Sequence, residues 1–142
     1  MTTPTITTDS AAAEVPRFSV AGEFLEALAN QDFERLGSAL SDDVRMRGLL
    51  PSGSFEWTGT DTAKSLFARW FGNTQQFELV DAVVGDVGQR LYLRWRLRLQ
   101  AERLGAGWHV VEQQAYADTD DSDRIRNLSI LCSGYCAERG DA

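Results

Sequence analysis

A stretch of strict two-residue alternation, RLYLRWRLRLQ at residues 90–100, constrains the fold more than any other part of the sequence. Its odd-numbered positions are all apolar, and its even-numbered positions are tyrosine, arginine or glutamine. Side chains of a strand point alternately to its two faces, so the pattern predicts a strand with one wholly apolar face. We expect that face to point into the protein and the opposite face, with Arg94, Arg96 and Arg98, to lie outside.

Helices are expected before this strand and further strands on both sides of it. Apolar residues at three-and-four spacing predict a helix from Ser19 to Glu26, a short one capped by Asp32 and a third capped by Thr60. Alternation and turn residues predict the other strands at residues 44–50, 55–57, 77–84, 108–117 and 125–134. This order favours the α+β class, with three N-terminal helices packed on one face of a strongly curved, mostly antiparallel sheet that encloses a pocket.

The length of 142 residues is that of one domain. Residues 1–17 are rich in Thr, Ala and Ser and are expected to form a disordered tail. The folded domain is predicted over residues 18–136, and residues 137–142 are expected to be a frayed C-terminus.

Composition excludes several classes of protein. The net charge of −7 argues against nucleic acid as a partner, and no apolar run approaches the ~20 residues of a membrane helix. No secretory signal is recognisable at the N-terminus, so we expect a cytoplasmic protein. The two cysteines and one histidine do not form a metal-binding pattern, and we expect no metal and no organic cofactor.

Four stretches together resemble the nuclear transport factor 2-like superfamily, which includes ketosteroid isomerases and SnoaL-type polyketide cyclases. They are FLEALANQDFERLGSALSDDV, WTGTDTAKSLFARWF, RLYLRWRLRLQ and RIRNLSILCSGY, and the match covers residues 18–136. The resemblance implies a cone-shaped barrel with an internal pocket. It also implies a homodimer formed through the outer sheet face, which here carries Arg94, Arg96, Arg98 and Glu112.

The catalytic residues of the best-known members have no counterpart in this sequence. The resemblance places Phe24 where a ketosteroid isomerase has its tyrosine, Leu50 near its base and Gln113 near its second acid. Residues 127–130 contain no acid where SnoaL-type cyclases place their base, and no aspartate accompanies the arginines as an epoxide hydrolase of this fold would require. None of these mechanisms therefore carries over to this chain.

Strand parity predicts a mostly apolar pocket with a few polar groups, as in a small-molecule site. His109 is the candidate proton carrier, because its free pKa lies near neutrality. Gln113 could orient a carbonyl or hydroxyl group, and Cys132 is either a nucleophile or a small core residue. The expected ligand-binding residues are Gln113, Trp95, Met46, Leu50, Phe24, Cys132 and Leu128.

The sequence thus favours a domain that binds a small apolar molecule in an internal pocket. One alternative is a cofactor-independent isomerase, cyclase or dehydratase that acts on an apolar carbonyl compound, with His109 as proton carrier. A second alternative is a non-catalytic module for dimerisation or protein interaction.

Overall fold

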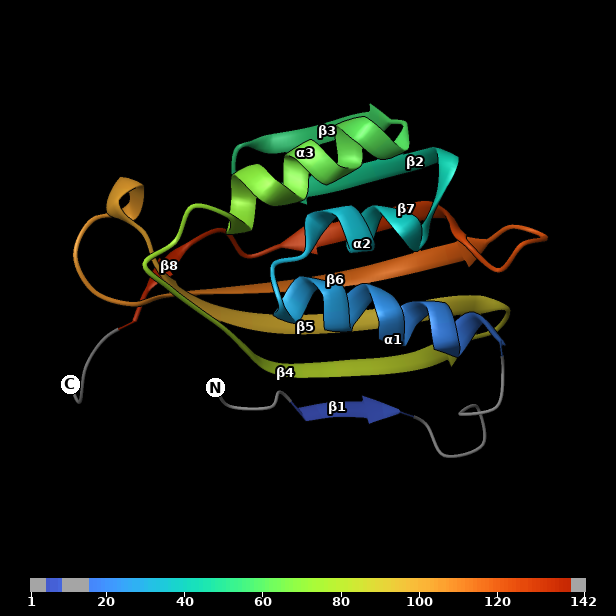
Figure 1. Cartoon of the computed structure of the whole chain (residues 1–142), viewed down its shortest axis with the longest axis horizontal. Helices are drawn as coiled ribbons and strands as arrows, with labels where there is room; N and C mark the ends of the chain where they lie inside the picture. Colours follow the sequence, from blue (N-terminus) through green and yellow to red (C-terminus); the bar gives the residue numbers. More distant parts are fainter. Residues whose placement is uncertain (1–4, 9–15, 139–142) are drawn as a thin grey trace.

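The computed structural model describes residues 5–8 and 16–138 and folds them as three helices against a single curled sheet (Figure 1). The α-helices are α1 (Pro16–Ala29), α2 (Phe33–Ser38) and α3 (Thr60–Phe71), and a short 3-10 helix, η2, spans Glu102–Leu104. The strands are β1 (Thr5–Thr8), β2 (Leu40–Leu50), β3 (Gly53–Thr58), β4 (Gln76–Val87), β5 (Arg90–Gln100), β6 (His109–Thr119), β7 (Ile125–Cys132) and β8 (Cys136–Ala137).

The sheet follows the order β1-β4-β5-β6-β7-β2-β3, and β8 pairs with the free end of β6. Neighbouring strands are antiparallel except for β1 beside β4 and β2 beside β7. Because β1 and β3 do not pair with each other, the sheet curls without closing into a barrel. Helix α1 packs on β4 and β5, α2 on β2, and α3 on β2 and β3, so one face of the sheet is covered. The predicted fold class is confirmed, with an open sheet in place of a closed barrel.

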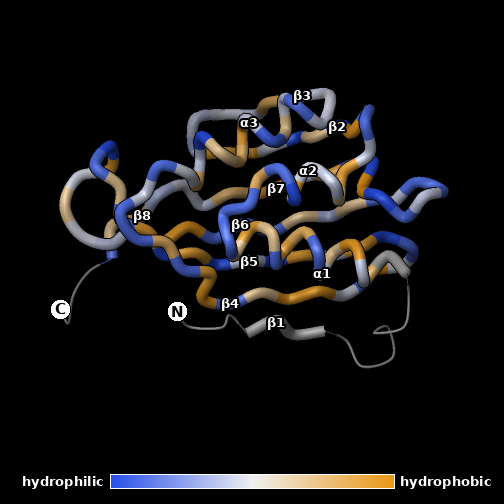
Figure 2. The backbone as a smooth tube through the Cα atoms, in the orientation of Figure 1, coloured by the Kyte–Doolittle hydropathy of each residue, from blue (hydrophilic) through white to orange (hydrophobic). Residues whose placement is uncertain are grey.

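The alternation in β5 determines which face of the sheet is the core. Leu91, Leu93, Trp95, Leu97 and Leu99 are all buried beneath the helices, as predicted. Apolar segments run through α1 and the central strands, whereas the turn between β6 and β7 is hydrophilic (Figure 2). The apolar faces of helices and sheet therefore meet in one continuous core.

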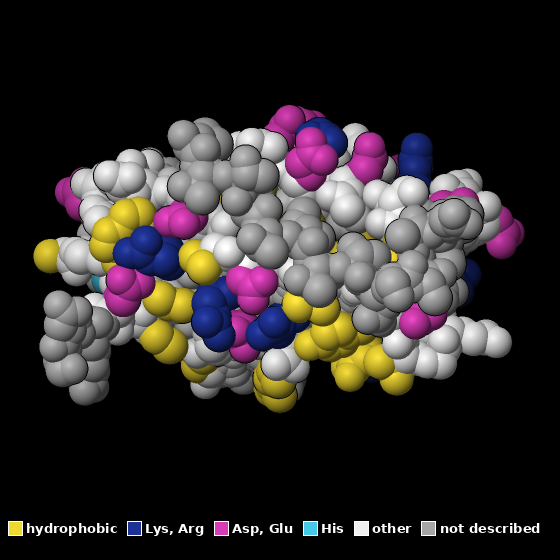
Figure 3. Space-filling view, turned by 90° about the horizontal axis from the view of Figure 1, so that it is seen from below, with side chains coloured by type: hydrophobic (Ala, Val, Ile, Leu, Met, Phe, Trp, Pro, Cys, Tyr) yellow, Lys and Arg dark blue, Asp and Glu magenta, His cyan; other side chains and the backbone are white. Residues whose placement is uncertain are grey.

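The arginines of β5 lie on the outer face, as predicted, and each contacts a carboxylate. Arg96 binds Glu112 on β6 at 2.8 Å. Arg98 donates from Nε to Glu138 at 2.7 Å, and this interaction lowers the pKa of Glu138. In the view from below, basic and acidic side chains are interleaved (Figure 3). Opposite charges across a ladder help to fix its register.

Helix starts follow the predicted pattern at one helix and depart from it at another. The carboxylate of Asp32 accepts from the backbone N–H of Arg35 at 3.1 Å, so Asp32 caps α2 as predicted. For α3 the predicted cap, Thr60, is wrong, because Gly59 occupies the capping position. The hydroxyl of Thr60 instead donates to the carbonyl of Ser41 at 2.8 Å and ties the helix to β2.

The two ends of the chain contain more structure than the sequence predicts. Residues 5–8, expected within the tail 1–17, form β1 beside residues 81–84 of β4, and α1 already begins at Pro16. At the other end β8 pairs with His109 and Val110, so Ala137 is not frayed. Backbone hydrogen bonds to the free edge of β4 or β6 order these segments. Such pairing needs no apolar periodicity in the segment itself, so the sequence gives no sign of it. The rest of both predicted tails, residues 1–4, 9–15 and 139–142, lies outside the described residues.

Candidate functional site

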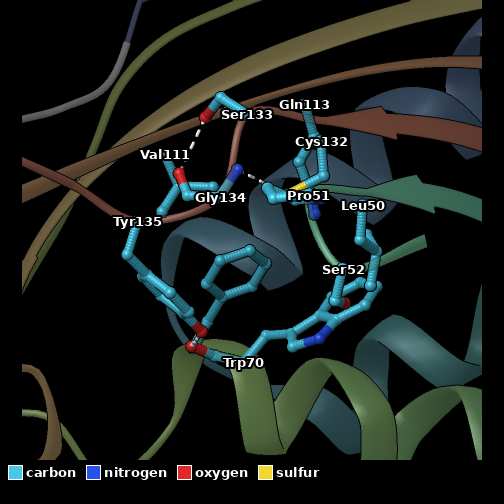
Figure 4. A pocket seen from close by; sticks show the side chains of 11 residues that line it. Leu50, Pro51, Ser52, Trp70, Val111, Gln113, Cys132, Ser133, Gly134 and Tyr135 are labelled. Carbon is cyan, nitrogen blue, oxygen red and sulfur yellow. Dashed lines mark hydrogen bonds between the residues drawn. The ribbon is translucent and has the colours of Figure 1, made fainter.

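A pocket of about 500 Å³ lies where four segments meet at one end of the sheet (Figure 4). These segments are the turn between β2 and β3, the C-terminal end of α3, the first half of β6 and the segment that follows β7. The lining residues are Leu50, Pro51, Ser52, Trp70, Phe71, Val111, Gln113, Cys132, Ser133, Gly134 and Tyr135. None of these described lining residues is Asp, Glu, Lys, Arg or His, so the pocket is apolar with a few neutral polar groups.

The aromatic wall of the pocket is held in place by a cap on α3. Arg103 donates to the carbonyls of Trp70 at 2.9 Å, Gly72 at 3.0 Å and Asn73 at 3.2 Å. A cation at a helix C-terminus satisfies the last carbonyls and complements the helix dipole. The cap therefore fixes the backbone from which Trp70 and Phe71 face the pocket.

Tyr135 covers the opposite side and is tied to the same helix end. Its hydroxyl donates to the carbonyl of Trp70, and Figure 4 shows the phenol directed at the backbone of that residue. Burial raises the pKa of the Tyr135 phenol, an effect partly offset by Arg103. The phenol is therefore protonated at neutral pH and acts as a donor.

Gln113 is the polar residue of the pocket whose hydrogen bonding most constrains the ligand. Only 1% of its surface is exposed, and its Oε1 accepts from the indole Nε1 of Trp95 at 2.9 Å. Its Nε2 has no hydrogen-bond partner among the described residues. An indole N–H can only donate, so the amide oxygen must face Trp95 and the amide nitrogen must face away from it. The structure thus places a buried, unsatisfied donor at the pocket wall.

Cys132 lies beside Gln113 at the end of β7. The two residues are directly opposite in the antiparallel ladder, and the backbone N–H of Gly134 donates to Cys132 Sγ at 3.3 Å. The left-handed backbone of Gly134 (φ 77°) turns the chain after β7, which therefore ends two residues earlier than predicted. Mutual hydrogen bonds between Ser133 and the backbone of Glu112 hold this segment against β6.

Three of the predicted site residues, Gln113, Leu50 and Cys132, line this pocket. The other expected ligand-binding residues are buried in the core under the helices, and Phe24 packs on Trp95 with ring centroids 5.5 Å apart. Those residues are Trp95, Met46, Phe24 and Leu128. The concave side of the sheet is filled by such side chains, so the pocket forms at its end.

His109, the predicted proton carrier, does not line the pocket. It lies on the same face of β6 as Gln113, four positions earlier, between Leu99 and Ala137. Its ring is largely buried, and within the part of the chain that the structure describes its Nδ1 has no hydrogen-bond partner.

Several lining residues were not predicted from the sequence, chief among them Trp70, Phe71 and Tyr135. Two turn signals were present: Pro51-Ser52-Gly53, and the glycine within CSGYC. Each marks a change of chain direction next to a strand end. Neither indicates that the two turns meet the end of α3.

Among residues 5–8 and 16–138, no group of three or more His, Cys, Asp or Glu side chains could hold a metal ion. In the same part of the chain, no helix is long and apolar enough to cross a membrane.

The sequence matches the family model of the SnoaL-like domain over residues 21–127. No curated protein matches it significantly. Among solved structures, a candidate polyketide cyclase from Xanthomonas campestris pv. campestris superposes with a TM-score of 0.65 at 18% identity, covering 82% of this chain and 89% of its own. An LEH-like epoxide hydrolase from M. tuberculosis gives a TM-score of 0.61 at 20% identity, covering 83% of each chain. A candidate ketosteroid isomerase from Kribbella flavida gives 0.61 at 15% identity, covering 89% of this chain and 84% of its own. At these identities the structural likeness concerns the fold alone.

Proposed function

We propose a function for this chain, which belongs to the SnoaL-like domain family of the nuclear transport factor 2-like superfamily, from its pocket, because the shared fold hosts different activities. The pocket binds a small uncharged molecule. The ligand has an apolar, preferably aromatic body and one hydrogen-bond acceptor, such as a ketone oxygen. The pocket volume of about 500 Å³ lies in the range of small-molecule sites.

The observation that carries this proposal is the unpartnered Nε2 of Gln113. A buried donor without a partner costs about 1–3 kcal/mol, and a ligand oxygen would remove that cost. The absence of charged side chains among the described lining residues disfavours carboxylates and phosphates as ligands. The walls of Trp70, Phe71 and Tyr135 favour a flat apolar body.

A pair of near-isosteric probes tests the proposal. The first is 2-acetylnaphthalene, and the second is 2-isopropenylnaphthalene, in which a CH₂ group replaces the ketone oxygen. We expect the ketone to bind the protein about tenfold more tightly than the hydrocarbon, because only the ketone accepts a hydrogen bond from Gln113. In Gln113→Leu this preference should disappear while hydrocarbon binding persists. Tryptophan fluorescence titration measures both affinities, since Trp70 faces the pocket.

Gln114→Leu is the matched control. Gln114 is the next residue on β6, faces the other side of the sheet and pairs with Arg94 and Leu131 in the ladders. The same chemical change there should leave the preference for the ketone intact. Equal affinity of the unmodified protein for the two probes, or no binding of either, would contradict the proposal.

We prefer binding to the enzymatic alternative because of where the polar groups lie. Proton transfer by His109 requires that residue at the ligand, and it is not among the described lining residues. Gln113 can orient a carbonyl but cannot move a proton near neutral pH.

We also propose that two copies associate through the outer sheet face. Leu49 and Leu131 are neighbours there in the β2–β7 ladder and are each about half exposed. Adjacent to them lie Tyr116, also exposed, and the paired charges of Arg96 and Glu112. A patch that combines apolar side chains with charges of both signs can be self-complementary about a two-fold axis.

Replacing Leu131 with glutamate should therefore convert a dimer into a monomer, because it buries a charge in the apolar part of the interface. Light scattering coupled to size-exclusion chromatography measures the mass. The control is Val87→Glu, which alters a similarly exposed apolar residue at the end of β4. A monomeric mass for the unmodified protein, or the same mass for the protein and for Leu131→Glu, would refute this interface.

A further inference from the structure

We propose that Cys132 captures α,β-unsaturated ketones covalently, with Gln113 activating the ketone oxygen. This inference rests on the proposed binding function and names the class of ligand within it. It is carried by two independent features of the same pocket. One is the Nε2 of the buried Gln113, which has no hydrogen-bond partner among the described residues, and the other is the thiol of Cys132 directly across the ladder from it.

The register of β6 and β7 brings the two groups together. Gln113 and Cys132 are opposite each other and both face the pocket, as Figure 4 shows. Side chains that are directly opposite in an antiparallel pair have Cβ atoms about 4.5–5.5 Å apart. An enone is short enough to bridge them, since its oxygen and its reactive β-carbon are separated by only two intervening carbon atoms.

The sulfur also has a donor of its own. The backbone N–H of Gly134 donates to Cys132 Sγ at 3.3 Å, and such a bond stabilises negative charge that forms on the sulfur. Cys132 is half-buried and lines the pocket, so a ligand bound there lies against this residue. The thiolate is the nucleophilic form of cysteine.

The reaction is a conjugate addition that needs no further reagent. The Cys132 thiol releases its proton to water, and the sulfur forms a bond to the β-carbon of the enone. The carbon–carbon π electrons move toward the carbonyl, and the resulting enolate oxygen accepts a hydrogen bond from Gln113 Nε2. Water then returns a proton to the α-carbon, which leaves a saturated ketone joined to Cys132 through a thioether.

The chain contains an internal control for this chemistry. Its second cysteine, Cys136, is exposed on β8 and does not line the pocket. An enone that reacts only because a thiol is present should label Cys136 at least as fast as Cys132. An enone that binds first should label Cys132 faster and with saturation.

The experiment uses the full chain and the aromatic enone benzylideneacetone at pH 8. Peptide mapping by mass spectrometry follows the adduct on each cysteine against time and probe concentration. We expect a hyperbolic concentration dependence at Cys132 and a slower, linear one at Cys136. The saturated analogue benzylacetone binds but cannot add, so it should protect Cys132 alone.

Two variants connect the rate to the proposed geometry. Gln113→Leu should slow the saturating rate at Cys132 by about 100-fold, the usual effect of removing one donor to a developing oxyanion. Gln114→Leu should not alter it. Cys132→Ser should lose the adduct while it still binds benzylacetone.

The outcomes separate this inference from the function on which it rests. If benzylacetone binds but Cys132 is labelled no faster than Cys136, covalent capture is overturned and the binding function stands. If benzylacetone does not bind and labelling at Cys132 is linear, both are overturned. Saturable labelling that is unaffected in Gln113→Leu overturns the role assigned to Gln113, and with it the proposed geometry.

Discussion

Replacing Trp95 with alanine should lower the free energy of unfolding by about 3–5 kcal/mol, the usual cost of removing a large buried aromatic side chain. Trp95 is fully buried at the centre of the core. Its ring centroid lies 5.5 Å from that of Phe24 and 6.5 Å from that of Phe67. The change also leaves Gln113 Oε1 without its partner. Urea denaturation, with the folded baseline checked by circular dichroism, measures the loss.

The variant Trp95→Phe separates packing from hydrogen bonding. It retains an aromatic ring but loses the indole N–H, so we expect a smaller loss of about 1–3 kcal/mol, mainly from the unpaired Gln113 oxygen. Because nothing then fixes the orientation of the amide, the preference of the pocket for 2-acetylnaphthalene over its hydrocarbon analogue should also fall.

Trp108→Phe is the matched control for this change. Trp108 is half-buried, with the guanidinium of Arg98 4.1 Å from its ring centre, and its replacement should cost at most about 1 kcal/mol, because phenylalanine keeps an aromatic ring under that cation. If Trp95→Phe were as stable as the unmodified protein and kept the preference for the ketone, the bond from Trp95 would not be what orients Gln113.

The fold was predictable from the sequence because it is encoded in local patterns. The alternation of residues 90–100 identified the inner face of β5, and Asp32 identified the start of α2. Segments that depend on distant partners were not predicted. Residues 5–8 form a strand only because β4 offers a free edge, and Ala137 is ordered only by pairing with β6.

The site was predictable only in part, for a related reason. Strand parity correctly placed Gln113 and Cys132 on one face, and the pocket contains both. Parity does not indicate how far the helices fill that face. Phe24 and Trp95 occupy the space in which the sequence suggested a ligand, and the pocket therefore lies beyond them, beside Trp70 and Tyr135. The position of the pocket therefore depends on side-chain volumes, and the apolar periodicity of the sequence does not show how completely these fill the interior.

Replacing Gly134 with alanine should weaken binding of 2-acetylnaphthalene by about tenfold or more, equivalent to at least ~1.4 kcal/mol. The left-handed backbone of Gly134, at φ 77°, disfavours any residue with a Cβ atom, and an added Cβ would lie 2.7 Å from Cγ of Pro51. Relief of that contact must move apart the two turns, which both line the pocket. The movement also takes the Gly134 N–H away from Cys132.

The control for this prediction isolates backbone strain from the contact with Pro51. Gly107 has a similar left-handed backbone, at φ 87°, but an added Cβ would meet no atom of the described residues within 4 Å. Gly107→Ala should therefore lose about 1–2 kcal/mol of stability from strain alone and bind the ketone normally. If the two alanine variants were equally destabilised and both bound the ketone normally, the contact between Gly134 and Pro51 would not shape the pocket. A loss of binding confined to Gly134→Ala would instead show that the close approach of Gly134 to Pro51 keeps the pocket in the shape that binds the ketone.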